Sequence, residues 1–327
     1  MSYSSLQYKS LAISPHFTAA MSIIGSLTML YDILKSGKIK KFCRLRILAA
    51  ISCVDILSSS SYFMSTWPIP KDLVPPSNAY AVIGNKGTCQ AQGFMIQMGI
   101  TSVFYNLMLA VVYVLMIKFD KSEGYMKKIE LWMHLIAIGW GMASSISALV
   151  LDLYHESTLW CWIGNSPFAK LNGDENGGNY KDFRWIFFYG PLWVCIGSIT
   201  ILMLILYKTV HAQDIKVRRF SSVSTTRRIS KRSRNIAYQC IAFSAAFYIT
   251  WTPATIARVY QFLGFKTSYS LMITMAIVTP VQGFLNSLVY FRPRIVNYMA
   301  NTYYASNFSR IFSSNEDPSS MHTARRD

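Results

Sequence analysis

The side chains with the most distinctive chemistry in this 327-residue chain are its six cysteines. Cys89 and Cys161 lie in polar segments beside long apolar runs, on the side of a membrane that we place outside the cell. Thiols there face an oxidising compartment, where a disulfide forms and persists. Because no third cysteine competes on that side, the sequence predicts a Cys89–Cys161 disulfide that ties a loop over the outer end. The other four are predicted to be free thiols: Cys43, Cys53, Cys195 and Cys240.

Asp55 falls in the middle of an apolar run, where a charge costs roughly 2.5–3.5 kcal/mol on insertion scales. It must therefore face the interior of a helix bundle or water, and its predicted partners are Asn286 and the serines Ser58 to Ser61. Two interpretations remain open. The carboxylate can be a switch element linked to water or a cation, or a protonated carboxyl can be a hydrogen-bonded packing residue.

A second candidate switch is the segment Trp251-Thr252-Pro253 in a later apolar run. Proline removes a helical hydrogen bond and kinks the helix, while tryptophan offers a large ring to a pocket. Aromatic residues also commonly serve in packing alone, so this pattern predicts a kink without proving a pocket.

Ser221 and Ser230 each stand two residues after a pair of arginines, in a polar connection between apolar runs. Basophilic kinases read this pattern, and a phosphate would add about −1.5 to −2 charges to a cationic loop. We predict regulatory phosphorylation at both serines. The same loop can also act only through its charge, by orienting the neighbouring helices.

Composition excludes several other classes of protein. The chain is 52% hydrophobic and only 14% charged, whereas soluble domains carry about 25% charged residues. The net charge of +17 would suit nucleic acid, but the basic residues lie almost entirely between apolar runs, where they orient a membrane protein. Five scattered histidines form no metal or nucleophile cluster, so we predict no enzyme, metal site or cofactor.

Membrane-spanning helices must position these residues, and seven stretches have the ~20 mostly apolar residues that a span needs. Two contain a proline, Pro15 or Pro280, which membrane helices tolerate. The sequence thus predicts an all-α membrane protein, a seven-transmembrane helix bundle. The predicted spans are Leu11–Leu34, Ile47–Trp67, Gln92–Ile117, Leu131–Leu151, Phe183–Tyr207, Ile236–Tyr260 and Tyr269–Phe291.

Lysine and arginine in the connections indicate the orientation. Of 32 such residues, 24 lie on one side, which we place inside, with the N-terminus outside. The predicted organisation is a short extracellular N-terminus at 1–10, a seven-transmembrane domain at 11–291, a short amphipathic eighth helix at 292–304 and a disordered cytoplasmic tail at 305–327. A continuation of the seventh helix is the alternative for 292–304.

Five segments carry a family resemblance, in order from the second to the seventh span: LRIL at 45–48 leading to Asp55, CQAQGFMIQ at 89–97, WCWI at 160–163, FYGPLW at 188–193 and QGFLNSLVY at 282–290. Together they resemble the slime-mould cyclic-AMP receptor-like family, or class E, of G-protein-coupled receptors. There is also some likeness to the secretin and adhesion (family 2) receptors.

The wider receptor superfamily is echoed by its switch residues. Trp251 and Pro253 resemble the sixth-helix switch, and Asn286 with Tyr290 resembles the seventh-helix motif. With Asp55 these residues form the predicted switch. Two departures put a rhodopsin-like activation lock in doubt: no Asp-Arg-Tyr ends the third span, and proline precedes rather than follows the asparagine of the seventh.

The resemblance implies a receptor in the plasma membrane that binds a ligand from outside and couples to a heterotrimeric G protein inside. The short N-terminus favours a small molecule or short peptide. An anionic ligand such as a cyclic nucleotide would need cationic donors, although the acidic second outer loop opposes strong anion attraction. The predicted ligand-binding residues are Gln97, Thr101, Arg184, Tyr189, Trp251, Arg258 and Lys266.

Two other seven-helix classes make distinct demands on the sequence. A retinal protein needs a Schiff-base lysine in its last span, and Tyr269–Phe291 contains no lysine. A small transporter built from two three-helix halves would show internal repetition. The first three and last three spans show no such correspondence, and a transporter stays the alternative to a receptor.

Overall fold

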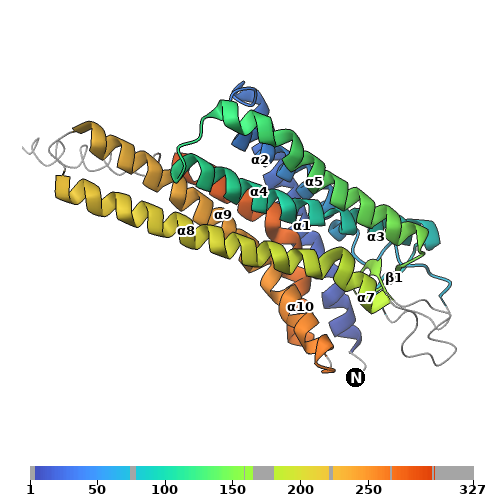
Figure 1. Cartoon of the computed structure of the whole chain (residues 1–327). Helices are drawn as coiled ribbons and strands as arrows, with labels where there is room; N and C mark the ends of the chain where they lie inside the picture. The colour runs from blue at the N-terminus through green and yellow to red at the C-terminus, as the bar shows by residue number, and fades with distance from the viewer. Residues whose placement is uncertain are drawn as a thin grey trace, which may run out of the picture.

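The computed structural model describes residues 4–73, 79–157, 159–164, 180–220, 224–265, 267–296 and 298, without the side chains of 217–233. Seven helical rods fill this part of the chain and pack into one elongated bundle (Figure 1). The first four rods are α1 (Ser5–Lys35), α2 (Cys43–Phe63), α3 (Lys86–Met98) continued by α4 (Ile100–Ile117), and α5 (Glu123–Val150).

The fifth rod contains α7 (Tyr180–Arg184), a π-helical turn (Trp185–Tyr189) and α8 (Gly190–Phe220). The sixth is α9 (Ser224–Phe262). The seventh contains α10 (Tyr269–Val278), a 3-10 turn (Thr279–Val281) and helical residues 282–296. A short antiparallel hairpin of β1 (Tyr154–Glu156) and β2 (Cys161–Ile163) lies between the fourth and fifth rods in sequence.

Six rods are long and apolar enough to cross a membrane in the described part of the chain. The rod that misses this criterion is α2, which carries Arg44, Arg46 and Asp55 and packs against α1 and α4. Large apolar side chains stay exposed around the bundle, among them Leu131 and Trp132 on α5. Such a surface is typical of a lipid-covered protein. The predicted multi-pass, seven-helix architecture is confirmed.

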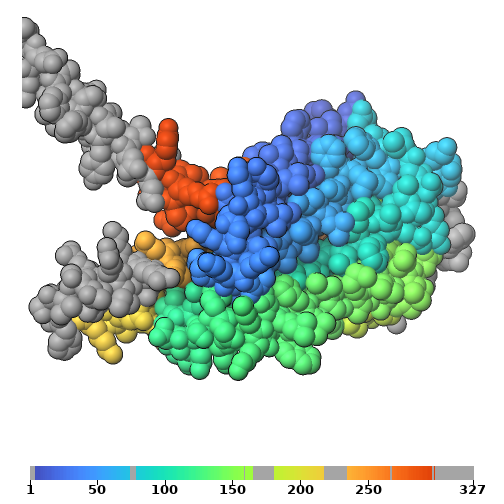
Figure 2. Space-filling view, turned by 90° about the horizontal axis from the view of Figure 1, so that it is seen from above, coloured from blue at the N-terminus to red at the C-terminus, as the bar shows by residue number. Residues whose placement is uncertain are grey.

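Packing divides the interior into two layers. One core cluster gathers aromatic residues near the hairpin, including Trp160, Trp162, Phe188 and Trp251. The other is mainly aliphatic and lies toward the first connection. In Figure 2 the visible face runs from α1 and α2 in blue through α3 in cyan to α5 in green.

Several helix ends differ from the predicted spans. α1 begins at Ser5 rather than Leu11, because Ser4 and Gln7 form a capping box that starts the helix six residues earlier. α2 ends at Phe63, four residues before the predicted end. Residues 208–220 and 224–235, predicted as a loop, are instead helical extensions of α8 and α9.

The seventh rod stays helical through Val296, past residue 292, where the separate eighth helix was predicted to begin. Residues 292–296 therefore follow the alternative of a continued seventh helix. The remainder of the predicted amphipathic helix, apart from Tyr298, and the whole predicted tail lie outside the described residues.

Three interruptions in the rods help to position the site. Gly99 separates α3 from α4. The π-helical turn inserts an extra residue, and its two last residues, Phe188 and Tyr189, are both buried. The 3-10 turn contains Pro280 and is followed directly by buried Gln282.

Candidate functional site

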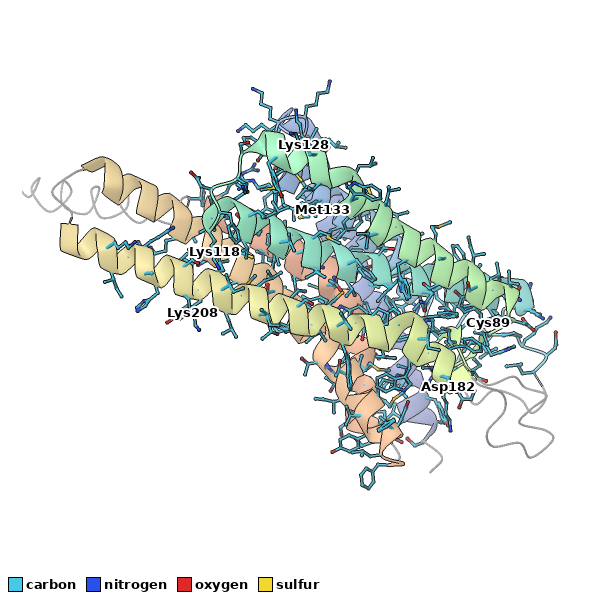
Figure 3. All side chains as sticks on the ribbon, in the orientation of Figure 1. Cys89, Lys118, Lys128, Met133, Asp182 and Lys208 are labelled. Carbon is cyan, nitrogen blue, oxygen red and sulfur yellow. A yellow bond between two sulfur atoms is a disulfide. The ribbon has the colours of Figure 1, made fainter. Side chains whose placement is uncertain are left out.

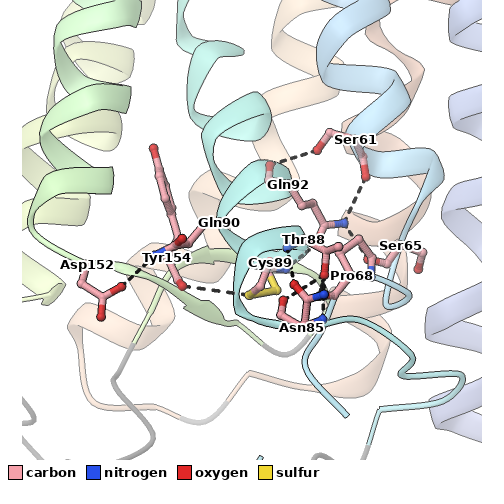
Figure 4. Close-up of a disulfide and its surroundings, with 11 residues drawn as sticks. Ser61, Ser65, Pro68, Asn85, Thr88, Cys89, Gln90, Gln92, Asp152 and Tyr154 are labelled. Atoms are coloured by element: carbon pink, nitrogen blue, oxygen red, sulfur yellow. Dashed lines mark hydrogen bonds between the residues drawn. A yellow bond between two sulfur atoms is a disulfide. The ribbon is translucent and has the colours of Figure 1, made fainter. Parts of the chain in front are cut away.

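A disulfide between Cys89 and Cys161 joins the first turns of α3 to β2 (Figure 4). The prediction of this bond is confirmed, and the other four cysteines are free. Gln92 reinforces the junction: its Oε1 accepts from the Cys161 N–H (2.8 Å), and its Nε2 donates to the carbonyls of Ser61 (3.1 Å) and Ser65 (2.7 Å). The hairpin is thereby fixed across the end of the bundle.

A second set of contacts holds the approach to the hairpin. Asp152 accepts from Lys86 (2.8 Å) and Gln90 (3.0 Å) at the start of α3. Burial opposes ionisation of Asp152, but these hydrogen bonds outweigh it and hold the pKa of the carboxyl below its usual value. The pair with Lys86 is largely exposed, so we assign it little stabilising energy.

Trp162 belongs to β2 of the hairpin, and its indole Nε1 donates to Gln97 Oε1 (3.0 Å). The amide of Gln97 in turn donates to Ser144 and to the Phe187 carbonyl, both at 3.2 Å. Thr101 is buried, and a Cβ on Gly141 of α5 would overlap its hydroxyl. Gln97 and Thr101 line neither of the two cavities described below, and their ligand contacts stay predictions.

A cavity of about 740 Å³ opens at this end of the bundle. Its wall is formed by the hairpin, the start of the fifth rod, the end of the sixth and the start of the seventh. Its charged residues are Glu156, Lys181, Asp182, Arg184 and Arg258. Figure 3 shows Asp182 and Cys89 toward this end, opposite Lys118, Lys128 and Lys208.

A smaller cavity adjoins it, because Arg258 and Met275 line both. The walls of the smaller one are mainly aromatic and include Trp162, Tyr189 and Trp251. The structure thus brings four predicted ligand residues together at the cavities: Arg184, Tyr189, Trp251 and Arg258. Lys266 lies outside the described residues.

Arg184 and Arg258 both approach the ring of Trp162, with guanidinium carbons 5.4 and 5.6 Å from its centroid. Arg184 donates to the Ile163 carbonyl (Nε, 2.9 Å). Arg258 donates to Gln261, while its buried Nε has no hydrogen-bond partner. Within the described residues, neither arginine forms an ion pair. Two cations that have no acidic partner among the described residues therefore lie against the cavities.

A chain of hydrogen bonds runs from the smaller cavity to the middle of the bundle. Trp251 Nε1 donates to Gln282 Oε1 (3.1 Å), and Gln282 Nε2 donates to Ser102 Oγ (3.0 Å). Ser102 donates to Asp55 Oδ1 (2.8 Å), and Asn286 donates to Asp55 Oδ2 (2.9 Å). The four hydrogen bonds connect the second, third, sixth and seventh rods.

The Asp55 carboxylate thus contacts one predicted partner, Asn286. Of the predicted serines, Ser58 bonds Asp55, but it donates to the backbone carbonyl (3.4 Å) and not to the carboxylate. The side chains of Ser58 and Ser60 donate to backbone carbonyls, that of Ser59 to Ser22, and that of Ser61 to the Gln92 carbonyl. Ser102 takes their place. Sequence patterns missed Ser102 and Gln282 as network members, because hydroxyls and amides in spans usually serve only helix packing.

The other switch residues have different surroundings. Pro253 lies inside α9, where it removes one helical hydrogen bond. Tyr290 donates not into the bundle but to Asp32 of α1 (2.7 Å), which also accepts from Arg294 (2.6 and 2.9 Å). The seventh rod is therefore tied to the first at the end opposite the cavity. The side chains of Ser221 and Ser230 lie outside the described residues.

Comparison with known proteins gives one partial sequence relative and a fold. No family model matches the sequence. A curated relative, "Cyclic AMP receptor-like protein F" of Dictyostelium discoideum, is 28% identical over 163 residues, which make up 49% of this chain and 44% of the relative. The chain thus spans less than half of that protein's length.

The crystal structure of squid rhodopsin superposes with a TM-score of 0.64 at 14% identity, over 93% of this chain and 87% of that chain. The likeness establishes the seven-helix fold alone, since the identity is too low to carry a ligand or a partner across.

Proposed function

We propose that this chain is a G-protein-coupled receptor of the cyclic-AMP receptor-like (class E) kind. It binds a small extracellular ligand and in response activates a heterotrimeric G protein. The observation that carries the proposal is the chain of hydrogen bonds from Trp251 in the cavity wall to Asp55. A ligand that packs better against one arrangement of Trp251 and Gln282 would shift the population of the whole network. The rhodopsin fold and the partial relative agree with this role.

The proposed orientation places the N-terminus and the cavity outside the cell and the C-terminus inside, in the plasma membrane. The supporting observation is charge: 24 of the 32 lysines and arginines belong to the connections and the C-terminal segment that the alternation of seven spans puts on one side. The disulfide lies at the cavity end, as an oxidising exterior requires.

The proposed ligand carries one compact anionic group. Buried charges without partners are costly, and Arg184 and Arg258 offer charge-assisted hydrogen bonds to a phosphate or carboxylate. Glu156 and Asp182 on the same wall disfavour a ligand with several negative charges. Cyclic AMP is one compound of the proposed class, and Lys266 is a further proposed donor.

Ligand-stimulated nucleotide exchange on purified G-protein α subunits tests the proposal. The reconstituted receptor is assayed with a panel of small phosphates and carboxylates that includes cyclic AMP. Arg258→Gln is expected to raise the half-maximal ligand concentration by about 10- to 100-fold, the range expected for one charged hydrogen bond. Lys71→Gln, an exposed residue away from both cavities, is the control and should match wild type. Ligand uptake into proteoliposomes without nucleotide exchange would instead identify a transporter.

The proposed phosphorylation of Ser221 and Ser230 has its own test. Replacing both serines with alanine should slow the decay of signalling after ligand addition by about two- to tenfold, because the −1.5 to −2 charges of each phosphate no longer oppose contacts of the cationic segment. Time-resolved nucleotide exchange in cells measures the decay. Ser224→Ala, which lacks the arginine pair two residues earlier, is the matched control. Unchanged decay in the double variant would leave the segment a purely electrostatic role.

A further inference from the structure

The first inner connection, residues 36–42, is fixed against α5 by two glutamates. Glu123 accepts from the Cys43 backbone N–H (3.0 Å) at the start of α2. Glu130 binds the guanidinium of Arg46 through both oxygens, with Nη2 to Oε2 at 2.6 Å. Glu123 and Glu130 are therefore both engaged in internal contacts.

Arg46 also holds the connection itself. Its Nη1 donates to the Ile39 carbonyl (2.7 Å), so residues 38–41 lie close to the first turns of α5. Within the connection, the backbone N–H groups of Lys41 and Phe42 donate to the Lys38 carbonyl (3.0 and 3.3 Å). The connection is thus an ordered turn rather than a loose loop.

Five exposed lysines surround this corner, and we call them the inner lysine patch: Lys38, Lys40, Lys41, Lys127 and Lys128. None of them takes part in an ion pair among the residues that the structure describes. Figure 3 shows Lys128 at the edge of the bundle, at the first turns of α5. The patch therefore combines a fixed backbone with five uncompensated positive charges.

The surface directly beneath the patch identifies the kind of partner. Leu131 and Trp132 follow Lys127 and Lys128 by one helical turn on the same sides of α5, and they are 63% and 64% exposed. Large exposed apolar side chains next to unpaired ammonium groups match a lipid, whose acyl chains cover the former while its headgroup contacts the latter. A soluble anion has no apolar part that could contact Leu131 and Trp132.

We propose that the inner lysine patch binds the headgroup of a multiply phosphorylated inositol lipid in the cytoplasmic leaflet. The proposal rests on the orientation given under the proposed function, but not on ligand binding or G-protein coupling. Lysines act as point charges for phosphate, and five of them on one ordered corner suit several phosphates better than the single charge of phosphatidylserine.

Native mass spectrometry of the purified full chain, titrated in detergent with phosphatidylinositol bisphosphate or phosphatidylserine, tests the proposal without ligand or G protein. The combined variant Lys40→Gln, Lys41→Gln, Lys127→Gln and Lys128→Gln is expected to weaken bisphosphate binding on the order of 600-fold, since each lysine near an anionic surface contributes about fivefold. The control removes four lysines from the same end, Lys118, Lys121, Lys208 and Lys216, and should lose less than tenfold.

Two outcomes would overturn the proposal: equal weakening in the two combined variants, or equal affinity of wild type for phosphatidylserine. Thermal unfolding in lipid-free detergent checks that each variant is folded. If the combined variant does not fold, Lys40→Gln and Lys128→Gln are measured singly, each with an expected loss of about fivefold. No loss in either would contradict the patch.

Discussion

Replacing Cys89 or Cys161 with serine is expected to remove most of the folded protein from the cell surface, and replacing both should do no further harm. The disulfide closes a loop between residues 72 apart in sequence. The chain-entropy model gives about 4 kcal/mol for a loop of this length. Because either single replacement already opens the loop, the effects of the two replacements cannot add.

Loss of the disulfide should also loosen the wall of the cavity. Cys161 stands next to Trp162, which contacts both arginines and Gln97. Surface staining together with thermal unfolding of the purified protein measures the effect. Cys53→Ser, which changes an exposed free thiol, is the control and should behave as wild type. If the losses of surface amount and unfolding temperature in the two single variants add up in the double variant, the effects do not come from loss of the disulfide.

Asp55→Asn is expected to lower ligand-stimulated nucleotide exchange per folded receptor by about tenfold. The carboxylate accepts from Ser102 and Asn286 at once. An asparagine keeps one carbonyl oxygen, so one of the two donors then faces an N–H group instead. An unsatisfied buried donor costs about 1–3 kcal/mol, enough to change the balance between two packings of the network.

Comparing Asp55→Asn with a control variant, Ser60→Ala, separates a switch role of Asp55 from a packing role. Ser60→Ala removes a hydroxyl that bonds only the Ile56 carbonyl of its own helix, and it should leave exchange unchanged. Surface amount and unfolding temperature are measured beside exchange for each variant. If Asp55→Asn lowers the unfolding temperature but leaves exchange per folded receptor at the wild-type level, Asp55 is a packing residue.

Local features of the sequence were enough to predict the architecture. Runs of apolar residues long enough to span a bilayer give seven helices, because a membrane leaves the backbone few other ways to satisfy its hydrogen bonds. The disulfide could also be predicted from the sequence, since Cys89 and Cys161 are the two cysteines in the polar segments predicted to lie outside. Even so, the end of α8 was predicted too early in the sequence and the start of α9 too late. The reason is that polar helical segments outside the membrane carry no hydropathy signal.

The side-chain partners were decided by the tertiary structure. The Asp55 carboxylate bonds Ser102 from another helix rather than the serines on its own, because those hydroxyls donate to backbone carbonyls or to Ser22 on α1. Gln97 accepts a hydrogen bond from Trp162, whereas Arg184 and Arg258 line the cavity. The disulfide holds the hairpin against α3, which places Trp162 within reach of Gln97. Hydropathy measures the preference of each side chain for lipid or water. The hydrogen-bond partners instead depend on how the helices are rotated and packed against one another. The sequence by itself therefore determined the seven helices and their covalent tie, and only their packing decided which polar groups meet.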